Sequence, residues 1–388
     1  MTTGYLALLA GLNDAPLTAA PAEEKKEGEA STSATPDAAA TQAVPMQEEK
    51  KEEKKDDQKD DKKKDDKKKK EEAKPIPLQR AIAYSWSDFH RKAKASTIGG
   101  PDSEIFSTLI NYGIWLLHQA KHTLQTASER DLDSHQKDAY KTFAQAAGVF
   151  AYVAAKAVDA PGQLSDTRAN VAKSLASLAL AEGQSISIDR AETSGNSPLL
   201  VAALARDTAE KFQLANDTLT SPNPTPRPDV SDKLLAYMGF KKEVYFGKAY
   251  FHHAQEFAKA EDTSAGKALR AYQTAIDRFK AAQPLLNIFY GDLEAAKATA
   301  TKAFVDTNLA AAEEAYNKLK KQNDMVYFAQ IPAEPESLPD SKSTLEPAEY
   351  TFPETDKKWT PEVYTNLKAR RDAIDEANKA KSGCCTIL

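Results

Sequence analysis

Apolar residues recur at intervals of three and four from Asp102 to Lys321, which is the period of an amphipathic α-helix. The clearest run covers residues 105–124, and a second run over residues 140–154 stops before Pro161-Gly162. The fold class predicted from this pattern is mainly all-α. We expect helices over residues 105–124, 140–154, 165–186, 198–212, 231–260, 267–282 and 292–322.

Turn signals separate these predicted helices. The sequence Gly195-Asn196-Ser197-Pro198 predicts a turn with Pro198 at the first helical position, and residues 221–229 form a proline-punctuated loop. Small residues recur between larger ones, which lets antiparallel helices approach closely, as in tetratricopeptide-type hairpins. Because no strict repeat is visible, we expect an irregular α-solenoid. From Asp324 the pattern is extended and bounded by prolines, which predicts a strap over the solenoid.

The first part of the chain has a different composition. Residues 1–76 are rich in Ala, Thr, Pro and Glu, and residues 47–74 are almost all lysines and acids in nearly equal number. Such a segment has little apolar surface to bury, so we expect disorder over residues 1–76. Its EEKK repeats could instead form a marginally stable helix exposed to solvent. The aspartates disfavour this, because aspartate is a poor residue for the interior of a helix. A folded domain is expected over residues 77–365 and a flexible tail over residues 366–388.

Charge and cysteine content exclude several functions. The 388-residue chain has a formal net charge of −5, which disfavours nucleic acid because phosphate binding needs a basic surface. The longest uncharged run, residues 105–120, is too short and too polar to span a bilayer. The only cysteines are Cys384 and Cys385, so the folded domain cannot hold a disulfide, a cysteine-bearing zinc site or a catalytic cysteine. This usage fits a reducing compartment.

The sequence carries no motif of an enzyme, since it lacks a glycine-rich phosphate loop and a nucleophile elbow. His118 and His122 have the spacing of a zinc-binding helix, but the accompanying glutamate and a third ligand are missing. His252 and His253 are adjacent and so point to different faces of a helix. We therefore expect no enzyme activity, no metal and no cofactor.

The strongest motif lies at the C-terminus, where Cys385-Thr386-Ile387-Leu388 matches a CaaX box. The final leucine favours geranylgeranyl over farnesyl, so we expect a prenyltransferase to attach one of these lipids to Cys385. One lipid binds membranes only marginally, and Cys384 could carry a second lipid or be inert. The alternative is an accidental pair of terminal cysteines.

Three stretches of the sequence resemble the BRO domain family. They are AEGQSISIDRAETSGNSPLLVAALARDTAEKFQLANDTL (181–219), KLKKQNDMVYFAQIPAEPESLP (318–339) and AEYTFPETDKKWTPE (348–362). The resemblance covers roughly residues 80–365, and some members of the family also end in a CaaX box. It implies a banana-shaped α-solenoid that binds ESCRT-III subunits, by receiving the C-terminal amphipathic helix of a CHMP-type subunit in an apolar groove.

The resemblance also implies which residues form that groove. Leu200 and Leu204 would share one face of a helix, and Asp133 and Lys137 would form a charged pair. Ser187 replaces an aromatic residue of some relatives, and Ile188 beside it is expected to compensate. The groove positions implied by the family are Asp133, Lys137, Ser187, Ile188, Leu200 and Leu204.

The sequence thus predicts a prenylated adaptor that holds an ESCRT-III-binding surface on a membrane facing the cytoplasm, endosomal or of another organelle, with the nuclear envelope included. A tetratricopeptide-like co-chaperone scaffold that clamps an acidic peptide is the alternative. A groove lined by Leu200 and Leu204 favours the adaptor, whereas a concave cluster of Lys and Arg favours the scaffold.

Overall fold

The computed structural model describes residues 5–9, 83–86, 96–99, 101–157, 164–220, 232–259, 264–291 and 295–383. The chain divides into two compact units. One comprises Met1–Ala15 with Leu78–Leu388, and the other, Pro16–Pro77, contains the lysine-rich run and lies outside the described residues. The predicted disorder of that run therefore stays a prediction.

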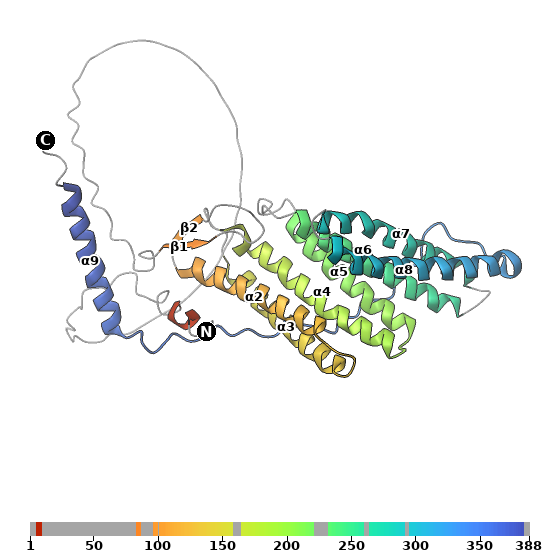
Figure 1. The fold of residues 1–388 in the computed structure, drawn as a ribbon, viewed down its shortest axis with the longest axis horizontal. Coiled ribbons are helices and arrows are strands. Elements are labelled where there is room, and N and C mark those ends of the chain that lie inside the picture. Colours follow the sequence, from red (N-terminus) through yellow and green to blue (C-terminus); the bar gives the residue numbers. More distant parts are fainter. Residues whose placement is uncertain are drawn as a thin grey trace, which may run out of the picture. The chain divides into compact units, whose positions relative to one another are not determined.

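Among the described residues of the first unit, seven long helices follow one another along the chain, and each packs against the next (Figure 1). Apolar residues at helical spacing bury the facing sides, as the sequence period predicts. This arrangement confirms a mainly helical fold built from consecutive hairpins. The helices are α2 (Pro101–Gln125), α3 (Leu132–Lys156), α4 (Ala169–Thr193), α5 (Pro198–Thr220), α6 (Asp232–Ala258), α7 (Ala265–Tyr290) and α8 (Ala295–Gln322).

Most predicted helix boundaries lie within a few residues of the observed ones, and α5 begins at Pro198 as expected. The start of α3, the end of α5 and the end of α7 differ most, and α7 continues through Pro284 to Tyr290 instead of ending at Ala282. Burial of Leu286 against the second core cluster holds this last part of the helix in place. No helix among the described residues is long and apolar enough to cross a membrane.

A short segment at the start of the chain is an exception to the expectation that residues 1–76 are mostly disordered. Residues 5–9 form a helical turn whose Leu6 and Leu9 are buried in the largest core cluster. Glu104 on α2 accepts hydrogen bonds from Tyr5 Oη at 2.6 Å and from Trp86 Nε1. Trp86 belongs to β1 (Ala83–Trp86), which pairs antiparallel with β2 (Ser96–Gly99). One carboxylate therefore fastens two separate N-terminal segments to α2.

Residues 328–360, here called the strap, have no helix or strand and run along the helices, which confirms the predicted extended segment. The Ala348 N–H donates to the Ala144 carbonyl at 2.9 Å. This contact requires Gly148, because a Cβ there would lie 1.8 Å from the Ala348 carbonyl oxygen. The Trp359 indole also donates to the Leu8 carbonyl at 2.9 Å, so the strap reaches the N-terminal turn.

Most of the segment expected to be a flexible tail is helical, since Pro361–Gly383 form helix α9, and its flexibility stays a prediction. Thr360 caps its start by accepting a hydrogen bond from the Val363 N–H at 3.4 Å. Cys384 and Cys385 lie outside the described residues.

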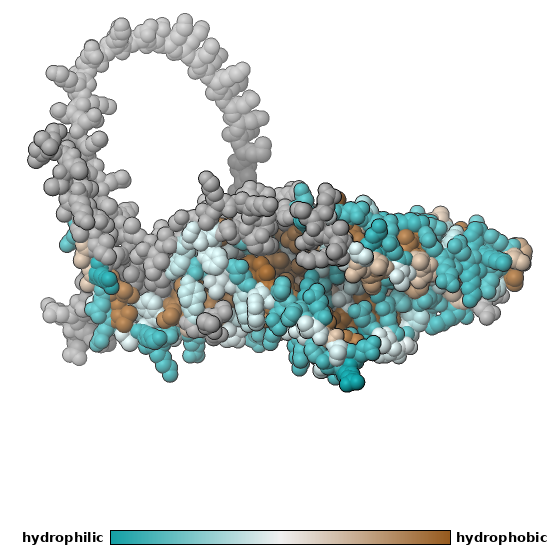
Figure 2. All heavy atoms as spheres, in the orientation of Figure 1, coloured by the Kyte–Doolittle hydropathy of each residue, from teal (hydrophilic) through white to brown (hydrophobic). Residues whose placement is uncertain are grey.

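Across α8, hydrophilic side chains cover most of the face drawn in Figure 2.

Candidate groove for a partner helix

A cavity of about 610 Å³ lies between α3, α4, α5 and the strap. We call it the groove. Its lining consists of apolar side chains from α4 and α5, cations from α3, α4 and the strap, and neutral polar groups. These residues are Lys137, Tyr140, Lys141, Ile186, Ser187, Arg190, Ala191, Ser194, Asn196, Leu200, Leu204, Lys342 and Thr344.

The floor of the groove comes from the first turns of α5. Pro198 starts this helix, so Leu200 and Leu204 lie one turn apart on the same face. Leu200 is half-buried, whereas Leu204 is only 3% exposed and also belongs to the core. Leu200 is therefore the floor residue that a ligand can cover without disturbing the fold.

The strap forms one wall of the groove and is fixed by Gln184 of α4. The Gln184 side-chain amide donates to the Lys342 carbonyl at 2.8 Å and accepts from the Thr344 N–H at 3.0 Å. The hydroxyls of Ser187 and Thr344 are 2.9 Å apart, and Tyr140 donates to the Thr344 carbonyl. Because Gln184 is fully buried, this wall is part of the fold and is present before any ligand arrives.

The rim of the groove is basic. Four cations line it, Lys137, Lys141, Arg190 and Lys342, and no carboxylate does so among the described residues. At its edge Asp133 pairs with Lys137 at 2.6 Å and with Arg190 at 2.9 Å. The hydrogen bond from Lys137 and the two positive charges lower the pKa of Asp133. Cations exceed acids at this surface, so it favours a ligand with negative charge.

The structure brings five of the six predicted groove residues together. Lys137, Ser187, Leu200 and Leu204 line the groove, and Asp133 is ion-paired at its edge. Ile188 is the exception and requires a correction, since it is fully buried in the core and cannot compensate for Ser187. Neighbouring residues on a helix point about 100° apart, so Ser187 and Ile188 lie on different faces of α4.

Other lining residues were not predicted. Arg190 could have been found from its place three residues after Ser187, which puts both on one face of α4. Tyr140 and Lys141 follow Lys137 by about one turn of α3 in the same way. Lys342 and Thr344 had no such signal, because the strap meets α4 across more than 150 residues of sequence.

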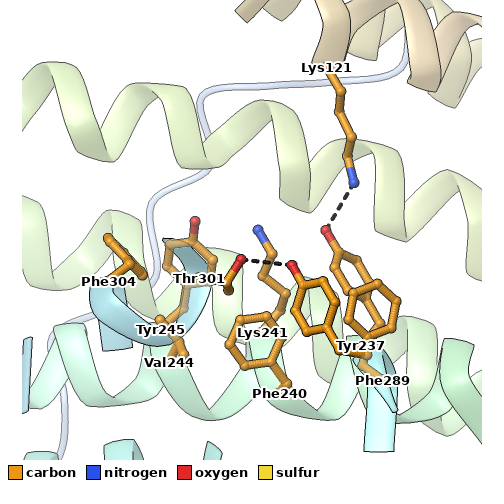
Figure 3. Close-up of a pocket in the computed structure, with 10 residues that line it drawn as sticks. Lys121, Tyr237, Phe240, Lys241, Val244, Tyr245, Phe289, Thr301 and Phe304 are labelled. Carbon is orange, nitrogen blue, oxygen red and sulfur yellow. Dashed lines mark hydrogen bonds between the residues drawn. The ribbon is translucent and has the colours of Figure 1, made fainter. Parts of the chain in front are cut away.

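A second cavity, of about 250 Å³, lies among α2, α6, α7 and α8 (Figure 3). Lys121 and Lys241 both extend toward it, among the rings of Tyr237, Phe289 and Tyr245. The Lys121 ammonium donates to the Tyr237 hydroxyl at 3.0 Å and is 4.9 Å from the centre of its ring. These groups come from helices that are distant in sequence, and the sequence analysis did not identify the site.

The cations of this second cavity are already paired. Glu182 of α4, itself buried, lies 3.6 Å from Lys121 and 3.4 Å from Lys241, and accepts a hydrogen bond from Tyr237. Burial opposes ionisation of this carboxyl, but the two lysines and the tyrosine outweigh it and lower the pKa of Glu182 to about 2. Farther along α4, Glu192 binds buried Lys248 at 3.0 Å and His252 at 2.9 Å.

The histidines that the structure describes lie apart from one another or in other contacts. His118 and His122 are both exposed on α2. His252 pairs with Glu192, whereas His253 is buried against Phe257, with 4.3 Å between the ring centres. Among the described residues, no group of three or more His, Cys, Asp or Glu side chains could hold a metal ion.

Comparison with known proteins identifies what the chain is similar to. The sequence profile of the BRO1-like domain family matches residues 71–369. The BRO1 domain-containing protein BROX of Danio rerio is 26% identical over 309 residues, which cover 77% of this chain and 72% of that protein. The Homo sapiens BROX is 24% identical over 303 residues, covering 76% and 72%.

Two solved structures share the fold. A structure titled "ALIX BRO1 CHMP4C complex" superposes with a TM-score of 0.55 at 17% identity, covering 71% of this chain and 73% of that one. Another, titled "Structure basis for endosomal targeting by the Bro1 domain", gives a TM-score of 0.53 at 18% identity, with coverages of 74% and 73%. At these identities the likeness shows the fold.

Proposed function

The chain belongs to the BRO1-like domain family, and on that premise we propose that it is an adaptor whose groove receives the C-terminal amphipathic helix of a CHMP-type ESCRT-III subunit. The observation that carries the proposal is the pair Leu200 and Leu204 on the floor of a 610 Å³ cavity with a basic rim. A solved relative of the same fold carries CHMP4C in its title, which supports this class of partner. Family membership favours a binding protein over an enzyme.

The groove suits an amphipathic helix with acidic residues beside its apolar face. Each leucine-sized side chain buried on the Leu200–Leu204 floor contributes about 1.5–3 kcal/mol. Acidic residues of the helix would meet Lys137, Lys141, Arg190 and Lys342, which steer the encounter and set the orientation. Two or three such anchors contribute about 3–9 kcal/mol before the cost of association is subtracted, so micromolar binding would also need the charges of the rim.

A crosslinking experiment tests where the helix binds. A synthetic CHMP C-terminal helix with a photo-reactive residue on its apolar face is irradiated with the full chain, and the adducts are mapped by mass spectrometry. We expect adducts on α4 and α5 between residues 186 and 204 and on the strap at 342–344. A scrambled peptide of the same composition is the control. Adducts confined to other helices would contradict the groove assignment.

Membrane attachment through the C-terminus is a separate part of the proposal, supported by the CaaX match at Cys385. A geranylgeranyl or farnesyl group there would hold the groove at a cytoplasm-facing membrane, endosomal or nuclear. Each buried methylene contributes ~0.8 kcal/mol, so Cys385→Ser should move the protein from the membrane fraction to the cytosol. Unchanged fractionation would contradict the anchor. Mass spectrometry of the terminal peptide determines whether Cys384 is also modified.

The basic rim also supports a second candidate function, a scaffold that clamps an extended acidic peptide. The four lining cations are the specific observation that favours it. An acidic peptide without apolar anchors distinguishes the two candidates. If it binds as tightly as the amphipathic helix, the clamp is correct. If it binds at least tenfold more weakly, the helix groove is correct.

A further inference from the structure

The four cations that line the groove differ in how their charge is balanced. Asp133 pairs with Lys137 and with Arg190, so one carboxylate serves both of these cations. Lys141 of α3 and Lys342 of the strap are exposed, and neither forms an ion pair with a described residue. The groove therefore contains two ammonium groups, on two different walls, that are unpaired within the described part of the chain.

Hydrogen bonds bring the walls that carry these two lysines together at Thr344. Tyr140, which precedes Lys141 on α3, donates to the Thr344 carbonyl. Lys342 and Thr344 are two residues apart on the extended strap, and both line the cavity. Lys141 and Lys342 therefore belong to the same part of the groove, one on each side of it.

The hydroxyl groups around Thr344 are already used by the fold. Thr344 Oγ1 donates to the side-chain oxygen of Gln184 at 2.8 Å, so Ser187 is the donor where these two hydroxyls meet at 2.9 Å. The Tyr140 hydroxyl donates to the Thr344 carbonyl. These bonds hold the wall in place, and the two unpaired lysines are the groups left to recognise a ligand.

The unpaired lysines lie toward one end of the groove floor. The Lys342 N–H donates to the Ala203 carbonyl at 3.2 Å, which places Lys342 beside Leu204. Arg190 is in the last turn of α4 and Leu200 in the first turn of α5, on either side of the short turn that joins these helices. The groove thus has one end where two cations share an acid, and another end where two lysines have none.

The acids that are near these lysines in the sequence do not occupy this end of the groove. Asp138, Asp340 and Glu346 are exposed, but none of them lines the cavity or forms an ion pair with Lys141 or Lys342. A phosphoryl group has a charge of about −1.5 to −2 and three acceptor oxygens, so it matches two ammonium groups. A single carboxylate balances only one of them, because it has one negative charge.

We propose that Lys141 and Lys342 bind a phosphoserine of the partner helix, at the edge of the apolar face that covers Leu204. Clusters of cations are a recurring means of recognising phosphorylated segments, and charge-assisted hydrogen bonds to phosphate oxygens are strong. Phosphorylation of the helix at this edge then strengthens its binding. The inference rests on the proposed function, since it requires the helix to lie on Leu200 and Leu204.

The test is a calorimetric titration of the full chain with a synthetic CHMP-type helix in four forms. The first has serine at the edge of its apolar face, and the second has phosphoserine there. The third has glutamate at that position, and the fourth has a phosphoserine on the opposite, polar face. We expect the edge phosphoserine to bind at least tenfold more tightly than serine and glutamate about threefold, and the polar-face phosphoserine to bind like serine.

A paired variant tests whether the two lysines cause the difference. Lys141→Gln with Lys342→Gln should abolish the tenfold gain and still bind the unmodified helix, because the apolar floor is intact. The charge-matched control is Lys280→Gln with Lys320→Gln, two exposed lysines that do not line the groove, and it should keep the full gain. Thermal melts of both variants verify that they fold like the parent.

The outcomes separate this inference from the proposed function. If the unmodified helix binds but edge phosphorylation gives no gain, the phosphoserine site is wrong and the helix groove stands. An equal gain from the polar-face phosphoserine, or a gain that survives Lys141→Gln with Lys342→Gln, would also overturn the site, because the attraction would then come from elsewhere. If no form of the helix binds, the proposed function fails and this inference fails with it.

Discussion

Helix α4 contributes charged side chains to two sites that look alike in composition and differ in chemistry. It presents Arg190 to the groove and Glu182 to the cations around the second cavity. Both sites combine lysines with apolar or aromatic side chains. In the second site a buried acid pairs with the lysines, whereas in the groove the cations outnumber the single acid, Asp133, at the edge. The pairing of the cations, more than their number, distinguishes a binding surface from a structural element.

The second site has the geometry of a cross-brace. Glu182 on α4 bonds Lys121 of α2 and Lys241 and Tyr237 of α6, so one carboxylate connects three helices. Lys241 also lies within 6 Å of the ring centres of Phe212, Tyr237 and Tyr245, at 5.8, 5.6 and 5.8 Å. Both lysines contact Glu182, whereas Lys141 and Lys342 of the groove form no ion pair with a described residue, which is why we place recognition in the groove.

The largest effect on stability is expected from Glu182→Gln. This change leaves the Lys241 ammonium buried without its partner, and breaking a buried ion pair costs about 3–5 kcal/mol. The groove acid provides the matched control: Asp133→Asn removes an exposed ion pair and should change the free energy of unfolding far less than Glu182→Gln does. Urea denaturation of both variants measures the two free energies of unfolding. Similar losses for the two would contradict the distinction between the sites.

The pH dependence of stability tests the same difference between the two sites. The pKa of Glu182 is about 2 in the folded protein and ordinarily about 4.5, so its contribution is complete above pH 4.5 and is lost as the pH falls toward 2. The shift corresponds to about 3 kcal/mol. The free energy of unfolding of the parent should therefore fall more steeply with pH in this window than that of Glu182→Gln. Parallel pH profiles for the two proteins would show that Glu182 is not the group responsible.

How far the sequence predicts each site depends on the distance between the interacting residues. Leu200, Leu204 and the pair Asp133–Lys137 were implied by the resemblance to the BRO domain, and helical spacing adds only that the members of each pair share one face. Gln184–Thr344 and Glu182–Lys241 could not be predicted, because helix packing and the course of the strap bring them together. The buried apolar positions of the helices could be predicted from the helical spacing of apolar residues in the sequence.

The errors also have physical reasons. Ile188 was misplaced by taking a sequence neighbour for a spatial one, although the helical period of α4 separates it from Ser187. The turn at residues 5–9 is too short for a periodic signal, and burial of Leu6 and Leu9 by the rest of the domain stabilises it. The helix expected to end at residue 282 continues past Pro284, because packing of Leu286 keeps α7 helical there.

A smaller effect is expected from the groove cations. Arg190→Glu removes one rim charge and leaves Asp133 with Lys137 alone, so the affinity for an acidic CHMP-type helix should fall about tenfold at low salt. Raising the salt concentration should narrow the difference, because these side chains are exposed. Lys241→Glu cannot serve as a control for Arg190→Glu, because it breaks the buried ion pair with Glu182 and so affects folding. Lys280→Glu on α7, outside both sites, is the charge-matched control and should leave the affinity unchanged.

The groove assignment is tested most directly by comparing two adjacent leucines. Leu199 is exposed and does not line the groove, whereas Leu200 beside it does. Affinity for the CHMP-type helix is measured by calorimetric titration of Leu199→Asp and Leu200→Asp, with a thermal melt on the same preparations. Leu200→Asp should fold like the parent and lose at least a hundredfold in affinity, about 2.7 kcal/mol, because a carboxylate on the floor must be desolvated under the ligand. Leu199→Asp should bind like the parent. Equal affinities for two folded variants would contradict the groove.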